Sequence, residues 1–145
     1  SRIVKLEMYT LTYESTATNT VKGAEMEELL EKARTNNSRD SITGCLIYYK
    51  GSFVQLLEGD KSKIEVLYAK IQKDERHKNV TLFSEDEIST RMFPNWGMAY
   101  YPINENHATK YEYEQFKRNL IMLSDLVKPK QFWKKIKNLI SDPPL

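Results

Sequence analysis

Apolar and polar side chains alternate at the start of the chain, as they do along a strand that buries one face. Within residues 6–13, Tyr9, Leu11 and Tyr13 fall on one face, and two threonines fall on the other. The pattern predicts a β-strand whose inner side is rich in aromatic residues.

Two later segments carry apolar residues at the three- and four-residue spacing of an amphipathic helix. The first helix is expected to begin near Ala24 and to end near Asn36 and Asn37, and the second covers residues 64–71. Their apolar positions are Met26, Leu29, Leu30 and Ala33 in the first, and Ile64, Leu67, Tyr68 and Ile71 in the second. Each helix therefore has one face to bury.

Two β-rich runs, residues 42–49 and 52–58, lie between these helices and are separated only by Lys50 and Gly51. Glycine supplies the positive φ that a two-residue hairpin loop requires, so the two runs are predicted to form a hairpin.

Two more strands are predicted near residues 80–83 and 95–101. In the last strand, Trp96, Met98 and Tyr100 are expected to share one face. The fold class is therefore α+β, with a ferredoxin-like βαββαβ sheet and an added fifth strand. C-terminal helices, expected near residues 110–127 and 129–139, would cap this sheet.

The composition narrows the class of protein without naming a function. The chain has 145 residues, enough for one domain, and a formal net charge of +2, too small to favour nucleic acid as a partner. Cys45 is the only cysteine, which excludes an internal disulfide and a CxxC metal site. No apolar run approaches the roughly 18 residues that cross a bilayer, and the first residues lack the apolar stretch of a signal peptide. We expect a cytoplasmic protein without a bound metal.

Gln55 stands between Phe53 and Leu57 on one face of its predicted strand. If that face is buried, an amide without partners costs about 1–3 kcal/mol, and a buried Tyr13 hydroxyl has the same need. The pattern is equally compatible with a Gln55 that faces solvent from an edge strand.

Three other sets of residues have both a structural and a functional interpretation. Asn37 continues the apolar stripe of the first helix, but asparagine is also common at helix C-termini. Trp96 and Met98 are typical core residues at strand spacing. His77 ends the run Asp74-Glu75-Arg76-His77 without a paired nucleophile or base, so we do not expect an enzyme.

Six short stretches resemble, in order and spacing, the BLUF family of flavin-binding blue-light sensors. They are Leu11-Thr12-Tyr13-Glu14-Ser15, Ala33-Arg34-Thr35-Asn36-Asn37, Ile42-Thr43-Gly44, Phe53-Val54-Gln55-Leu56-Leu57-Glu58-Gly59, Asp74-Glu75-Arg76-His77 and Arg91-Met92-Phe93-Pro94-Asn95-Trp96-Gly97-Met98. The resemblance implies a photosensor domain over residues 1–103 and a C-terminal helical output segment over residues 104–145.

The resemblance implies roles at single positions. Tyr13 falls at the photoactive tyrosine, and Gln55 falls at the switching glutamine. Asn37 falls at the asparagine that bonds the C4 carbonyl edge of the flavin, with Asn36 as a second polar contact.

Met98 and Trp96 match a pair of residues that trade places near the glutamine in different family members. Gly97 departs from the alanine or small polar residue expected between them, which leaves open which of the pair faces inward. Lys70 and Arg76 are candidates for the phosphate end of the flavin.

The same resemblance implies a photocycle. After blue light excites the flavin, Tyr13 donates an electron and then a proton, and the Gln55 amide rotates or tautomerises. The flavin absorption then shifts slightly to the red, and the change passes to a partner protein or to oligomer contacts. The expected cofactor is FAD, with FMN and riboflavin as alternatives.

Other functions remain open on the sequence. The main alternative is a constitutive protein-interaction module on the same fold, without signalling photochemistry. An RNA-binding module is disfavoured, because Lys50-Gly51-Ser52-Phe53-Val54 is shorter than the RNP1 pattern and lacks a stacking aromatic residue. The basic segment 130–137, which contains Trp133, is either a solvated cap or a surface for an acidic partner or membrane.

Overall fold

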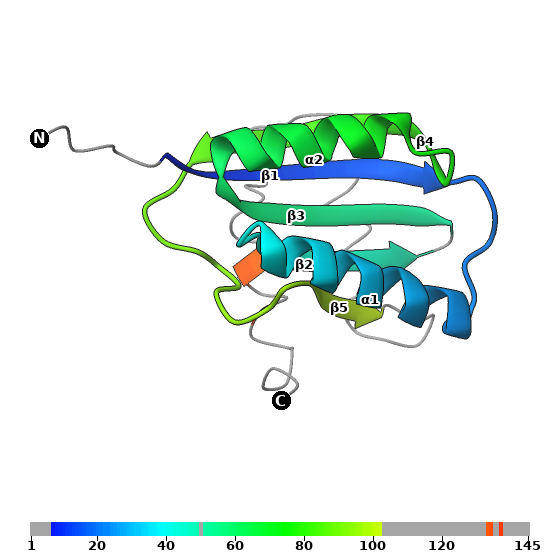
Figure 1. Ribbon diagram of the computed structural model, residues 1–145. Helices are drawn as coiled ribbons and strands as arrows, with labels where there is room; N and C mark the ends of the chain where they lie inside the picture. Colours follow the sequence, from blue (N-terminus) through cyan, green and yellow to red (C-terminus); the bar gives the residue numbers. More distant parts are fainter. Residues whose placement is uncertain (1–6, 50, 103–132, 135–136, 138–145) are drawn as a thin grey trace, which may run out of the picture.

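The computed structural model describes residues 7–49, 51–102, 133–134 and 137. Five strands form one mixed sheet, and two helices lie side by side on one of its faces (Figure 1). The elements are β1 (Met8–Ala17), α1 (Gly23–Arg39), β2 (Thr43–Tyr49), β3 (Ser52–Asp60), α2 (Lys61–Lys73), β4 (His77–Glu87) and β5 (Ala99–Pro102).

The strand order is β4-β1-β3-β2-β5. The pairs β1–β3, β1–β4 and β2–β3 are antiparallel, and β5 adds to β2 as a parallel strand. This is the ferredoxin-like α+β arrangement with a fifth strand, so the predicted fold class is confirmed.

The alternation along the strands separates two hydrophobic clusters. The inner face, defined as the face covered by α1 and α2, carries Tyr9, Leu11, Tyr13, Phe53 and Leu57. The outer face is the opposite one, and its cluster contains Cys45, Ile47, Val54, Leu56, Phe93, Ala99, Tyr101 and Trp133. The predicted faces of β1 and β3 are confirmed, and Gln55 is buried rather than exposed on an edge strand.

The hairpin between β2 and β3 forms as predicted. Tyr49 pairs with Ser52, and Gly51 has a φ of 77°, which a residue without a Cβ adopts at no steric cost.

Several elements extend beyond the segments that the sequence predicts, among them α1 and β4. Helix α1 runs to Arg39, and the Asp40 N–H closes its last turn on the carbonyls of Asn36 and Asn37. Strand β4 pairs with β1 from Ala17 to Tyr9, but it is an edge strand with mostly exposed side chains. Its apolar pattern is therefore weak, and the length comes from backbone pairing.

The last strand is shorter than predicted and begins at Ala99. The preceding residues form a turn in which Trp96 N–H donates to the Phe93 carbonyl and the Trp96 carbonyl accepts from Gly44 N–H. Trp96 packs on the outer cluster, whereas Met98 is buried in the inner cluster. The expected shared face of Trp96 and Met98 is wrong, because alternation holds only within a strand.

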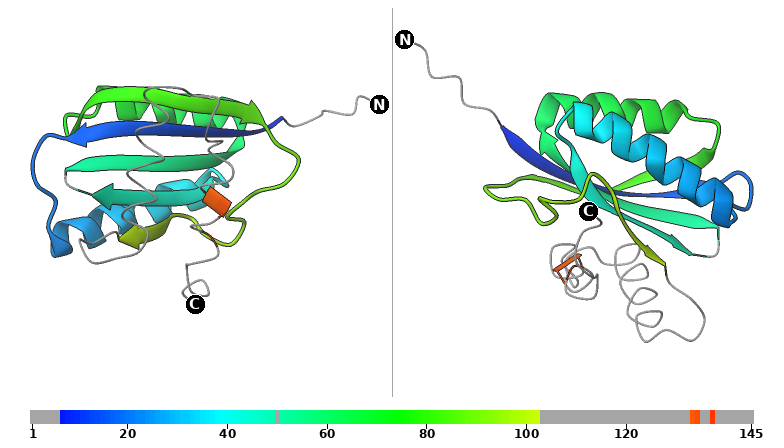
Figure 2. Two further views of the ribbon diagram at one scale, coloured as in Figure 1. Left: turned by 180° about the vertical axis from the view of Figure 1, so that it is seen from behind. Right: turned by 60° about the horizontal axis from the view of Figure 1, so that its bottom comes forward.

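The short orange segment at residues 133–134 lies on the side of the sheet away from the helices (Figure 2), and Trp133 packs in the outer cluster. It is 1% exposed, its Nε1–H donates to Thr12 Oγ1 at 3.1 Å, and its ring meets Phe93 edge-on at 6.3 Å. Lys134 and Lys137 are exposed. The other residues of the predicted helices 110–127 and 129–139, and the boundary at residue 103, lie outside the described residues.

Neither described helix is long and apolar enough to cross a membrane. Within the same residues, no group of three or more His, Cys, Asp or Glu side chains comes together as a metal site.

Gly44 faces the β3 backbone so closely that a Cβ would lie 2.0 Å from the Leu56 carbonyl oxygen. We predict that Gly44→Ala lowers the free energy of unfolding by about 1–3 kcal/mol, because a strand must move to admit the methyl group. Gly97→Ala is the matched control, since a Cβ there meets nothing closer than 3.7 Å. Denaturant unfolding that shows Gly44→Ala as stable as the parent would contradict this packing.

Candidate functional site

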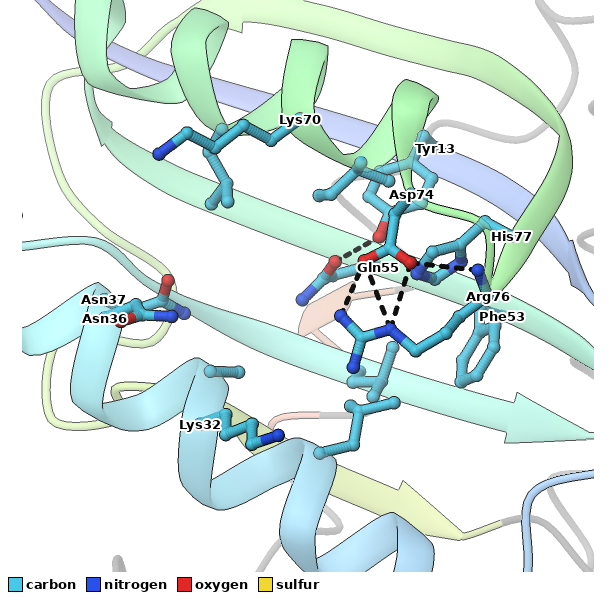
Figure 3. Close-up of a pocket in the computed structure, with 15 residues that line it drawn as sticks. Tyr13, Lys32, Asn36, Asn37, Phe53, Gln55, Lys70, Asp74, Arg76 and His77 are labelled. Carbon is cyan, nitrogen blue, oxygen red and sulfur yellow. Dashed lines mark hydrogen bonds and ion pairs between the residues drawn. The ribbon is translucent and has the colours of Figure 1, made fainter.

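A cavity of about 250 Å³ lies between α1, α2 and the inner face of the sheet (Figure 3). Its walls are mainly apolar, with Leu29 and Ala33 contributed by α1 and Leu67 and Ile71 by α2. Polar groups enter it at few points, which is the usual composition of a cofactor pocket.

Tyr13 and Gln55 face each other on the cavity wall because β1 and β3 pair in that register. Both side chains are buried, and the Tyr13 hydroxyl donates a hydrogen bond to Gln55 Oε1 (Figure 3). Burial raises the pKa of Tyr13 above its ordinary value, so the phenol keeps its proton at neutral pH.

The other end of the Gln55 amide meets Met98. Gln55 Nε2 donates to Met98 Sδ at 3.2 Å, and Met98 is fully buried. A thioether sulfur only accepts hydrogen bonds, which fixes the N–H₂ end of the amide toward Met98 and the carbonyl end toward Tyr13. The three side chains form one continuous chain of hydrogen bonds.

Helix α1 holds the backbone beside Met98. Asn37 Nδ2 donates to the Gly97 carbonyl at 2.8 Å, and Arg34 Nε donates to the Met98 carbonyl at 3.0 Å. Asn37 is 3% exposed, and that bond is its only side-chain hydrogen bond within the described part of the chain. Within the described residues, its Oδ1 makes no hydrogen bond.

Charged side chains gather at the mouth of the cavity. Lys32 comes from α1, Lys70 from α2, and Arg76 from the turn before β4 (Figure 3). Arg76 forms a two-pronged pair with Asp74, with Nη2 to Oδ2 at 2.6 Å and Nε to Oδ1 at 3.0 Å. The Arg76 side chain lowers the pKa of Asp74 to about 2.

His77 closes one end of the same cavity. Its Nδ1 lies 2.8 Å from Ser15 Oγ, and its ring packs on Phe53 with centroids 5.1 Å apart. Burial lowers the pKa of His77, so the neutral ring is favoured at neutral pH.

The structure brings together most of the residues that the sequence singles out. Six line the cavity, and Met98 joins them through Gln55; the six are Tyr13, Asn36, Asn37, Gln55, Lys70 and Arg76. Trp96 lies at the outer cluster and does not reach the cavity lining. The sequence-based site omitted Lys32, Asp74 and His77, although two of these stand in the Asp74-Glu75-Arg76-His77 run.

Comparison with protein families identifies the domain to which these residues belong. Residues 8–99 match the family model described as "BLUF: Sensors of blue-light using FAD". The chain belongs to the BLUF family. It therefore contains a flavin-binding blue-light sensor domain, and such a domain is a sensor and not a catalyst.

Curated BLUF relatives are much longer proteins. The chain is 33% identical over 122 residues to photoactivated adenylate cyclase subunit alpha of Euglena gracilis, which covers 84% of this chain and 11% of that protein. It is 37% identical over 86 residues to the beta subunit of the same organism, covering 59% of this chain and 10% of that protein. The chain thus spans about a tenth of the length of these relatives.

Solved BLUF structures include proteins of similar size. BlrB, described as a BLUF protein in its dark state, superposes with a TM-score of 0.71 at 28% identity, over 93% of this chain and 98% of that one. The photo-activated state of BlsA superposes with a TM-score of 0.75 at 26% identity, over 95% and 99% of the two chains.

The cavity fits the ring of a flavin. Apolar side chains of α1 and α2 face each other across it, as a planar aromatic ring requires, and the amides of Gln55 and Asn37 lie at its polar points. Cavities for whole drug-sized molecules measure about 300–1,000 Å³. A cavity of about 250 Å³ is therefore of a size for the ring of a flavin rather than for a whole flavin nucleotide.

The Asp74–Arg76 pair predicts a pH dependence of stability in the flavin-free domain. Asp74 has a pKa of about 2 when folded against an ordinary 3.8, so its contribution is present above about pH 4 and is lost as the pH falls through 2. We expect Asp74→Asn to cost about 1 kcal/mol at pH 6, and this difference to shrink toward pH 2. Glu75→Gln, at the exposed neighbouring carboxylate, is the control. Urea unfolding with a pH-independent Asp74→Asn difference would contradict the pairing.

Proposed function

We propose that this protein binds FAD between α1 and α2 and detects blue light through the hydrogen-bonded series Tyr13–Gln55–Met98. The observation that carries the proposal is this series: a buried phenol, amide and thioether joined by hydrogen bonds at the wall of a ring-sized cavity.

The polar partners of the flavin ring follow from the hydrogen-bond donors and acceptors that the cavity side chains do not use within the described residues. An isoalloxazine edge carries one N–H donor and carbonyl acceptors in one plane. The free Oδ1 and second N–H of Asn37 match that pair of functions, and Asn36 offers a second amide at the rim. Lys70, and Arg76 once it leaves Asp74, supply the positive charge for the phosphates.

The bound flavin supplies the absorption of blue light and accepts an electron. Tyr13 holds the proton that moves, in its hydrogen bond to Gln55 Oε1. When Tyr13 gives up an electron, its phenolic hydrogen becomes strongly acidic and shifts toward that oxygen. Return of the electron and the proton restores the phenol, so no substrate is consumed.

Rotation or tautomerisation of the Gln55 amide is then the lasting change. A rotated amide directs its oxygen toward Met98 Sδ, and two acceptors cannot share a hydrogen bond. Met98 and the backbone that carries it must therefore adjust. This is a local change of hydrogen bonds with a wider structural consequence.

The output is proposed to act on another protein, without catalysis by this domain. Trp133 packs on the outer face directly behind the photoactive pair, since its partner Thr12 is the residue before Tyr13. Residues 104–145 are thus proposed as the segment that senses changes in the sheet. We expect the protein to work in the reducing cytoplasm, in keeping with its single buried Cys45.

Tyr13→Phe and Gln55→Leu test the photoactive pair. Both variants are expected to bind flavin, because each keeps most of the side-chain volume, but to lose the red-shifted state after blue light. Tyr9→Phe is the matched control, a buried tyrosine of the same strand and face that does not line the cavity. Light-minus-dark absorption spectra would refute the assignment if either variant shifted and recovered like the parent.

Lys70→Gln tests the contact to the phosphate end of the flavin. Removing the charge at the mouth is expected to weaken the binding of FAD and FMN by about tenfold, and to leave riboflavin, which has no phosphate, unchanged. Lys73→Gln, also on α2 but outside the cavity lining, is the control. Equal losses for all three flavins in fluorescence titrations would contradict a phosphate contact.

A further inference from the structure

The segment between β4 and β5 passes from one face of the sheet to the other. Met92 and Phe93 pack with the outer cluster, while Met98, five residues after Phe93, is buried on the inner face against Gln55. The position of the Met98 sulfur therefore depends on how this segment is fixed.

One buried carboxylate fixes the outer end of the segment between β4 and β5. Glu58, at the end of β3, is 1% exposed and lies on the outer face. Its Oε1 accepts the Met92 N–H at 2.8 Å, and its Oε2 accepts the Phe93 N–H at 2.7 Å. Two successive backbone N–H groups thus donate to one carboxylate.

A third donor completes the arrangement. Thr43 Oγ1 donates to Glu58 Oε2 at 2.8 Å, while Arg91 Nη1 donates to the same hydroxyl oxygen at 2.9 Å. The guanidinium has no acceptor atom, so the threonine hydrogen must be directed at Glu58. Among the described residues, the three groups that meet the carboxylate are all donors, and an acceptor-only side chain satisfies them together.

The inner end of the segment is held separately by backbone acceptors. The carbonyls of Trp96, Gly97 and Met98 accept from Gly44 N–H, Asn37 Nδ2 and Arg34 Nε. Between the two ends, the Phe93 ring is fully buried and meets Trp133 edge-on. Phe93 thus joins the Glu58 anchor to Trp133, and the short stretch from Phe93 to Met98 joins it to the inner end, so we expect a shift at Glu58 to change both the Met98 contact and the Trp133 contact.

We propose that Glu58 is a positioning residue for the light switch. Its carboxylate anchors Met92 and Phe93, and so keeps the Met98 sulfur against the Gln55 amide on one face and Phe93 against Trp133 on the other. This role rests on the proposed Tyr13–Gln55–Met98 switch and adds to it the residue that sets its geometry.

Glu58→Gln tests the role, because an amide of equal size offers one acceptor fewer and places an N–H₂ against backbone donors. In protein labelled at its methionine methyl carbons, the Met98 resonance of the flavin-free variant is expected to move, while the Met26 resonance, from α1 in the inner cluster, stays in place.

In flavin-loaded protein, the rate of dark recovery after blue light is expected to change by about tenfold, as loss of one charge-assisted bond implies. Thr43→Val, which removes one of the three donors, should give a smaller change, and the exposed Glu87→Gln none. An unmoved Met98 resonance in a folded Glu58→Gln variant would overturn the proposal.

A reciprocal measurement does not need Glu58→Gln to fold. If Glu58 couples the two ends, Met98→Leu in flavin-free protein must speed hydrogen exchange at the Met92 and Phe93 amides, because coupling acts in both directions. Unchanged exchange at those two amides would also overturn the proposal. The Met98 resonance and the amide exchange are both measured in flavin-free protein without light. A parent protein that binds flavin but shows no red shift would instead disprove the proposed switch, so the two failures are distinguishable.

Discussion

Gln55 carries an amide into the buried inner face, where its carbonyl and its N–H₂ group both need partners. The Tyr13 hydroxyl meets the carbonyl, and the Met98 sulfur meets the N–H₂ group. Leaving either unpaired would cost about 1–3 kcal/mol, so the amide ties the central strands to the segment before β5. In the proposed function the same requirement makes the site responsive, since a change at Tyr13 would be passed on through Gln55 to Met98.

The sheet separates the cavity from the outer face, on which we propose that a partner or the C-terminal segment acts. Tyr13 and Thr12 are neighbours in sequence and point to opposite faces, so Trp133 lies behind the Tyr13–Gln55 pair. The segment from Met92 to Met98 connects the two faces along a second path. A small rearrangement of hydrogen bonds in the cavity can therefore reach the outer face without a large movement of the helices.

The sequence predicted the fold class because it depends on local periodicity, whereas periodicity alone left the burial of Gln55 open and the roles of Tyr13 and Gln55 were implied by the BLUF resemblance. Alternation along β1 and β3 places Tyr13 and Gln55 on the same face, and the register of the two strands places them opposite each other. Trp96 could not be placed in this way, because a turn precedes Ala99 and alternation does not extend through it. The length of β4 and the hydrogen bonds of Glu58 were also not predicted. Both depend on backbone groups distant in sequence, such as the Phe93 N–H, 35 residues from Glu58. Backbone hydrogen bonds of this kind produce no pattern of side chains in the sequence.

The most direct test of the account is the absorption spectrum of the purified, flavin-loaded protein before and after blue light. The chain Tyr13–Gln55–Met98 predicts that the flavin bands shift slightly to the red on illumination and return in the dark, with the flavin still bound. A bound flavin that bleaches without a shift, or a protein that refuses added FAD, would contradict the account.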